Sequence, residues 1–131
     1  MIGERVRRMF DLGADPAVIA KHLGGDVWLG RILKQHPGIR TPGAWDGFEL
    51  SVRAILGQQV SVAAATTMAE RLASRFGTPV EAPNGLNRIF PSPGQLVAAP
   101  IEEVGVIGAR AETIRTLARA VGAGSLRLAT T

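Results

Sequence analysis

The stretch that decides the fold is Trp45-Asp-Gly-Phe-Glu-Leu-Ser-Val-Arg-Ala-Ile-Leu-Gly-Gln-Gln-Val-Ser-Val62. It opens with a helix-start signal, because Asp46 can cap a helix and Glu49 stands where a capping box reaches back to the cap. The apolar residues that follow recur at the spacings of one helical face, namely Phe48, Val52, Ile55 and Leu56. An abrupt Gly-Gln-Gln turn then leads into a second helix.

The turn carries two amide side chains, Gln58 and Gln59, between apolar helices. One interpretation is that they satisfy carbonyl groups at the helix end. The other is that a long, neutral amide enters a DNA duplex and replaces the hydrogen bonds of a base that has been flipped out, a step that costs roughly a few kcal/mol of unstacking. The start of the second helix also offers free N–H groups that suit a phosphate oxygen, although Ser61 is expected to cap them itself.

Short helical segments and Pro- and Gly-rich loops make up the rest of the chain. Helices are expected over residues 2–12, after Asp15-Pro16, after Asp26, and over 46–56, 61–76, 93–98 and 109–122. Residues 37–44 and 77–92 are expected to be loops, and no segment alternates as a strand would. The prediction is an all-α fold, a compact bundle of about six or seven short helices.

The composition fits one globular domain over residues 1–131, and residues 124–131 look like the start of a linker. With no cysteine, and with His22 and His36 too far apart for a metal pair, the chain is expected to bind no metal. The net charge of +4 permits phosphate binding without demanding it. Neither a membrane span nor a secretory signal is recognisable, so a cytoplasmic location is the default expectation.

Other groups have simpler interpretations. Asp46 and Glu49 could form an acid–base pair, but capping explains both. The Gly105/Gly108 bend has the wrong spacing for a DNA-binding hairpin and is interpreted as a structural turn. Three arginines of the last helix are interpreted as a solvated face: Arg110, Arg115 and Arg119. A helix-turn-helix regulator is disfavoured, because residues 61–76 offer few groups for base edges.

Residues 53–61, RAILGQQVS, and the Ala-rich helix up to Gly77 resemble the helix-hairpin-helix DNA glycosylase superfamily, most closely its 3-methyladenine DNA glycosylase II family. Residues 8–12, 37–43 and 108–114 support the likeness, which spans about residues 5–128. The resemblance implies DNA base-excision repair: flipping alkylated bases such as 3-methyladenine out of double-stranded DNA and hydrolysing the N-glycosidic bond. It further implies no cofactor and a place of action at the nucleoid.

By position in the family, Gln59 matches the wedge that fills the gap opposite the orphan base, and Gln58, Val60 and Ser61 complete the wedge turn. The family's hairpin and the catalytic Asp after it are not in this sequence and would lie beyond Thr131. The chain is therefore expected to be the first half of a glycosylase helical domain, with no catalytic residue and no activity alone. It could self-associate through uncovered apolar helix faces. The alternative is a non-catalytic helical module that binds DNA or a protein.

Overall fold

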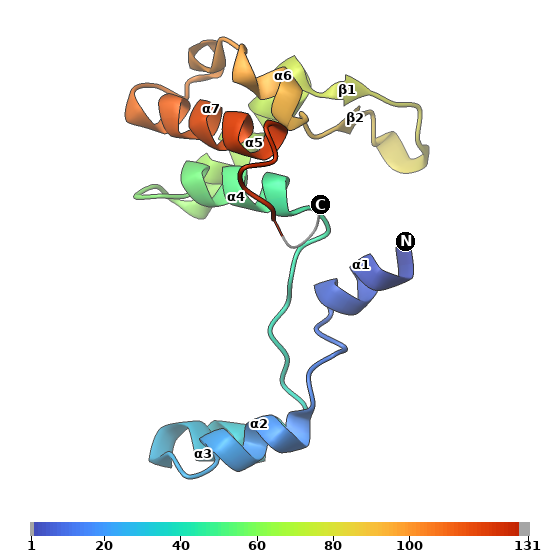
Figure 1. The fold of residues 1–131 in the computed structure, drawn as a ribbon, viewed down its shortest axis with the longest axis vertical. Helices are drawn as coiled ribbons and strands as arrows, with labels where there is room; N and C mark the ends of the chain where they lie inside the picture. Colours follow the sequence, from blue (N-terminus) through green and yellow to red (C-terminus); the bar gives the residue numbers. More distant parts are fainter. Residues whose placement is uncertain (1, 129–131) are drawn as a thin grey trace. The chain divides into compact units, whose positions relative to one another are not determined.

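The computed structural model describes residues 2–128, which form seven α-helices, two short 3-10 helices and one two-stranded sheet (Figure 1). The chain divides into two compact units, Met1–Trp45 and Asp46–Thr131. The predicted all-α class is confirmed, and the small sheet is a minor addition to it. No helix among the described residues has both the length and the apolar character that crossing a membrane requires.

The first unit contains three helices: α1 (Ile2–Met9), α2 (Pro16–Leu23) and α3 (Val27–Gln35). Their starts follow from side-chain caps. The Asp15 carboxylate accepts a hydrogen bond from the Ala17 N–H at 2.8 Å, and the Asp26 carboxylate accepts one from Trp28 at 2.8 Å. Both predicted helix starts are therefore confirmed, since each carboxylate satisfies N–H groups that the helix itself leaves without a partner.

The loop after α3 is tied to the end of α1. The Arg40 guanidinium donates to the carbonyl oxygens of Asp11 and, at 3.1 Å, of Ala14. The Gly43 N–H donates to the Met9 carbonyl at 3.0 Å. The helix predicted over residues 2–12 ends earlier, at Met9, because Asp11 adopts a left-handed conformation with φ of 51°.

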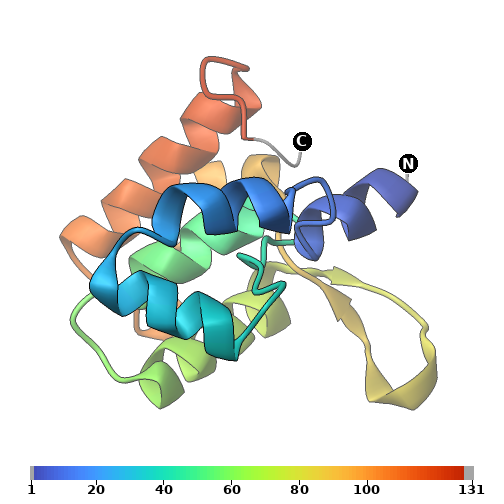
Figure 2. The ribbon, with the colours of Figure 1, turned by 90° about the horizontal axis from the view of Figure 1, so that it is seen from below.

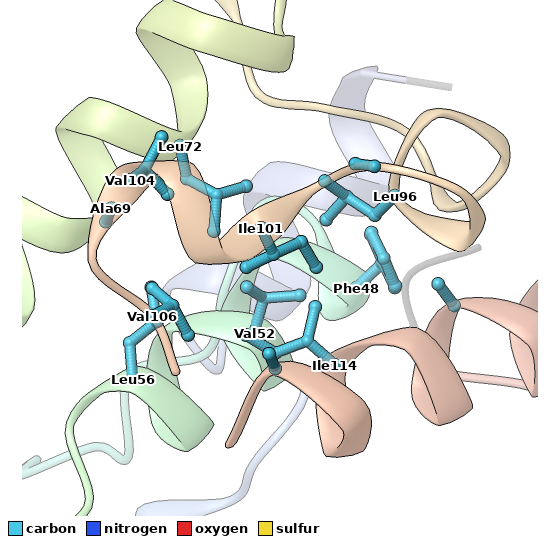
Figure 3. Close-up of a cluster of buried hydrophobic side chains, with 13 residues drawn as sticks. Phe48, Val52, Leu56, Ala69, Leu72, Leu96, Ile101, Val104, Val106 and Ile114 are labelled. Atoms are coloured by element: carbon cyan, nitrogen blue, oxygen red, sulfur yellow. The ribbon is translucent and has the colours of Figure 1, made fainter. Parts of the chain in front are cut away.

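The second unit holds the remaining elements: α4 (Gly47–Leu56), α5 (Val62–Phe76), β1 (Thr78–Pro79), η1 (Pro83–Gly85), β2 (Arg88–Ile89), α6 (Pro93–Val97), η2 (Ile101–Val104) and α7 (Ala109–Gly122). Helix α7 packs against α4 and α6, and α5 packs against α4 and η2. Val52, Ile101 and Ile114 lie at the centre of the core, where α4, η2 and α7 meet (Figure 3). All three are completely buried.

Two caps of the second unit differ from the expectation. Asp46 caps α4 by accepting from the Glu49 N–H at 2.8 Å, but the Glu49 carboxylate pairs with Arg53 at 2.7 Å. Only half of the predicted capping box therefore forms, because a guanidinium one turn further along the helix attracts the carboxylate. A complete capping box joins Ser92 to Gln95 at the start of α6.

The segment 77–92, predicted to be a loop, contains an antiparallel hairpin in which Thr78 pairs with Ile89 and Pro79 with Arg88. The hairpin extends away from the helices of its own unit (Figure 2). At its base the backbone passes so close to Gly77 that an added β-carbon would collide with the carbonyl oxygens of Ala73 and Ile89. Strands this short have no alternating pattern, which is why they could not be predicted.

The prediction of one domain over residues 1–131 stays a prediction. The predicted linker, 124–131, lies partly outside the described residues. Its first residue, Gly124, has a φ of 71° and follows the end of α7.

Candidate nucleic-acid interface

The turn that follows α4 is built by a short series of backbone hydrogen bonds. The Gly57 N–H donates to the Arg53 carbonyl at 2.9 Å, and the Gln58 N–H donates to the Ile55 carbonyl at 3.4 Å. The turn continues to Gln59, whose φ of 56° is left-handed. Helix α4 therefore ends before this turn, and Gln58 and Gln59 of the turn are exposed.

Gln59 holds an unusual backbone conformation for a residue with a side chain. A left-handed conformation costs an L-residue roughly 1–2 kcal/mol, whereas glycine adopts it freely. Among the described residues other than glycine, only Asp11 shares a positive φ. The side chains of Gln58 and Gln59 are exposed and form no hydrogen bond with the described part of the chain. The interpretation that these amides satisfy helix-end carbonyls is therefore wrong.

The other two residues of the wedge turn are occupied differently. The Ser61 Oγ accepts a hydrogen bond from the Ala64 N–H at 3.2 Å and so caps α5, as the sequence indicated. Val60 is half-buried and lines a recess of about 230 Å³ between the end of α4 and the start of α5. The residues whose side chains are free to meet a ligand are thus Gln58 and Gln59.

A larger, open recess of about 710 Å³ lies beside the two glutamines. Its other lining residues come from the segment that precedes α7 and from the first turns of that helix: Ile107, Ala109, Arg110 and Thr113. The Ile107 side chain is 71% exposed, although it is apolar. Gly105 and Gly108 flank this segment with φ of 87° and 62°. The structure thus brings the glutamine turn and the Gly105/Gly108 bend to one place.

Arg110 links the two sides of the recess. Its Nη2 donates to the Gln58 carbonyl oxygen at 2.8 Å, and its side chain is half-buried. The prediction that Arg110, Arg115 and Arg119 form a solvated face is wrong for Arg110 and for Arg115. The Arg115 side chain is only 21% exposed and donates to the Ala99 carbonyl at 3.0 Å.

Arg115 also forms an ionic contact with Glu102 at 2.5 Å. The hydrogen bond from the Arg115 guanidinium lowers the pKa of the Glu102 carboxyl below its usual value. The same bond raises the pKa of Arg115. Together with the bond to Ala99, this contact joins η2 and the segment between α6 and η2 to α7, and so supports the helix that carries Arg110.

We expect Arg115→Met to lower the melting temperature of the protein and to weaken the dependence of its stability on acid. Glu102 has a lowered pKa in the folded state, so its contribution is present above its unfolded pKa and is lost as pH falls through the folded value. Thermal melts of both proteins from neutral to acidic pH measure this. If the melting temperatures of the two proteins differed by the same amount at every pH, the assignment of the lowered Glu102 pKa to Arg115 would be contradicted.

The sequence did not indicate Ile107, Arg110 or Thr113 as part of the site. Arg110 and Gln58 are 52 positions apart, so their proximity depends on the packing of α7 against α4. The sequence feature that could have indicated these residues is the Gly105/Gly108 pair beside them, which the sequence alone favours as a structural turn. No group of three His, Cys, Asp or Glu residues within residues 2–128 is placed to hold a metal ion.

Two known families match parts of this chain. A family described as "HhH-GPD superfamily base excision DNA repair protein" matches residues 52–124, more than half of the chain. The chain therefore belongs to the HhH-GPD superfamily of base excision DNA repair proteins. The family described as the AlkA N-terminal domain matches residues 1–46. The first match ends at residue 46 and the second begins at residue 52, close to the boundary between the two compact units at Trp45 and Asp46.

Curated relatives give the same assignment and confirm the resemblance to 3-methyladenine DNA glycosylase II. A Mycobacterium tuberculosis protein named "Probable bifunctional transcriptional activator/DNA repair enzyme AlkA" is 42% identical over 95% of this chain and 25% of its own length. The Escherichia coli "DNA-3-methyladenine glycosylase 2" is 37% identical over 93% of this chain and 42% of its own length. The chain thus spans less than half the length of these relatives.

Solved structures share the fold. The structure of MBOgg1 in complex with a low-affinity DNA ligand matches with a TM-score of 0.72 and 31% identity, covering 93% of this chain and 43% of that one. The 3-methyladenine DNA glycosylase of Archaeoglobus fulgidus matches with a TM-score of 0.69 and 27% identity, covering 90% and 42%. The predicted glycosylase-like helical fold is therefore confirmed.

Proposed function

We propose that this chain forms the duplex-opening part of a base-excision DNA glycosylase, and that Gln59 is the wedge that enters the gap left by a flipped base. The single observation that carries the proposal is the state of Gln59: its backbone is held left-handed, and its exposed amide has no hydrogen-bond partner in the described part of the chain. Membership of the HhH-GPD superfamily supports it.

The chemistry of an amide suits this role. Its carbonyl accepts and its NH₂ group donates, so it can pair with the Watson–Crick edge of whichever base has lost its partner. It carries no charge, so its insertion into the base stack has no ionic desolvation penalty. Gln58 and the rest of the turn flank the wedge, while Ser61 is kept for capping α5 and so for directing that helix.

The proposed contribution of this chain is to open and hold the duplex rather than to cleave the glycosidic bond. The six residues that line the recess beside Gln59 include no carboxylate. Departure of a base through an oxocarbenium-like sugar is assisted by a negative charge at the reacting centre. We therefore assign no catalytic role to these six residues, and we expect no release of 3-methyladenine from methylated DNA by the 131 residues alone.

The remaining parts of the proposal concern substrate, partners and place of action. The substrate is double-stranded DNA with an alkylated base such as 3-methyladenine, supported by the name of the 37% identical E. coli relative. The place of action is the nucleoid. Self-association through apolar helix residues is proposed as well, because Leu50 of α4 and Val62 of α5 are exposed.

The test is a comparison of duplex affinities. We expect the chain to bind a duplex with a stable abasic site more tightly than an intact duplex, and Gln59→Ala to reduce that preference by about tenfold, or about 1.4 kcal/mol, because the gap then stays unfilled. Mobility shifts or anisotropy at low salt measure both affinities.

Gln35→Ala is the matched control, since Gln35 is an exposed glutamine of α3, in the other unit. It should leave the preference unchanged. Equal affinity of the unaltered chain for both duplexes would refute the wedge. Binding to neither duplex at low salt would leave a protein-interaction module as the remaining function.

A further inference from the structure

We propose that Arg110 is a positioning residue that fixes the direction in which Gln59 points. This inference rests on the proposed function, because it concerns how the wedge is aimed. It starts from the hydrogen bond in which Arg110 Nη2 donates to the Gln58 carbonyl oxygen at 2.8 Å. Among residues 2–128, no other hydrogen bond joins the glutamine turn to α7.

The oxygen that accepts this bond, the Gln58 carbonyl oxygen, belongs to the peptide unit that sets the backbone conformation of Gln59. The Gln58 carbonyl belongs to the planar peptide unit that connects Gln58 to Gln59. Rotation of that unit is what changes φ of Gln59. A guanidinium held on the carbonyl oxygen therefore opposes rotation of the peptide plane and keeps Gln59 at its φ of 56°. Without this bond, Gln59 can relax to the right-handed conformation that costs an L-residue less.

The turn has weak support from its other side. On the α4 side, the last backbone bond before Gln59 runs from the Gln58 N–H to the Ile55 carbonyl, and it is long at 3.4 Å. A charged donor at 2.8 Å is the stronger of the two restraints. The bond from α7 is thus the main restraint on the peptide unit before the wedge.

Helix α7 is a firm base for this restraint. The residue after Arg110 is Ala111, which is completely buried, and Ile114 and Ala118 continue the same buried face. The Arg115 contacts to Ala99 and Glu102 join the helix to neighbouring elements. The Arg110 backbone is therefore fixed by the core, and its guanidinium meets the turn from a defined direction.

A competing role for Arg110 is a direct contact with a DNA phosphate. The two roles differ in measurable ways. Losing a phosphate contact weakens binding to every duplex alike and reduces the salt dependence of log K by about one unit of slope. Losing a positioning residue weakens only the preference for the abasic duplex, because only that preference uses the wedge.

The test substitutes Arg110→Met, which removes the donor and keeps most of the side-chain length. Arg119→Met is the matched control, since it removes the same charge from the same helix, where Arg119 instead pairs with Glu112. Affinities of both proteins for abasic and intact duplexes are measured from low to moderate salt, after thermal melts establish that each is folded.

We expect Arg110→Met to reduce the preference for the abasic duplex by about threefold to tenfold, with a salt slope equal to that of Arg119→Met. In a Gln59→Ala background it should reduce the preference no further, since it acts through that side chain. A uniform loss on both duplexes with a lower slope, or additive effects in the double substitution, would overturn the inference.

A second measurement needs no DNA. The three-bond HN–Hα coupling of Gln59, which depends on φ, should change in Arg110→Met and stay as it is in Arg119→Met, because only the first substitution lets φ leave 56°. An unchanged coupling in Arg110→Met would overturn the positioning role even if DNA binding failed. Conversely, a changed coupling in a chain that shows no preference for the abasic duplex would refute the proposed function and leave the restraint on the turn established.

Discussion

Replacing Leu56 by alanine is expected to lower the free energy of unfolding by about 2–5 kcal/mol. Leu56 is the last residue of α4 and is 0% exposed, within the cluster formed by α4, α5, η2 and α7. Removing its side chain loses apolar burial and leaves a cavity that rigid neighbours fill only partly. Denaturant unfolding of the chain measures the change.

The matched control is Leu50→Ala, the same substitution on the same helix. Leu50 is 52% exposed, so its truncation should cost well under half as much. Similar losses at the two positions would contradict the placement of the α4 face. Leu56 directly precedes Gly57, where the glutamine turn begins. We therefore also expect Leu56→Ala to weaken the preference for the abasic duplex, and Leu50→Ala to leave that preference in place.

The second large effect is expected at Gly77, where alanine should destabilise the protein by about 1–3 kcal/mol or more. An added β-carbon would collide with the carbonyl oxygens of Ala73 and Ile89. Both are backbone atoms, so relief requires the end of α5 to move away from β2. A thermal melt should show the loss, together with weaker exchange protection in the hairpin.

Gly94→Ala serves as the comparison, since a β-carbon on this glycine of α6 would meet nothing within 4 Å. It should be neutral or slightly stabilising, by up to about 1 kcal/mol, because alanine favours the helix over the unfolded chain more than glycine does. If both glycines tolerated alanine equally, the close approach at Gly77 would be refuted.

The sequence predicted the elements whose causes are local. Asp15, Asp26, Asp46 and Ser61 each cap a helix that begins where they indicated. These predictions succeeded because a cap and its partner N–H lie two or three residues apart. The apolar spacing of α4 was equally reliable, since Phe48, Val52 and Leu56 are all buried.

Features that depend on distant segments were not predictable. Arg110 was interpreted as solvated because nothing near it in the sequence shows that the Gln58 carbonyl lies beside it. The capping-box pattern predicts that the Glu49 carboxylate accepts a hydrogen bond from the Asp46 backbone, but the carboxylate instead pairs with the Arg53 guanidinium. The wedge turn itself was identified from its motif, and its role stays a proposal. Its left-handed geometry at Gln59 became visible only in three dimensions.

The anchoring of the glutamine turn from two helices has a consequence for the energetics of association. A flexible loop loses conformational entropy when it binds, and this loss subtracts from the affinity that its contacts provide. Here a long bond to the Ile55 carbonyl holds the turn weakly to α4, and the bond from Arg110 of α7 restrains it further before any ligand arrives. In the proposed complex, most of the distortion therefore falls on the duplex, while the protein enters it as a preorganised probe.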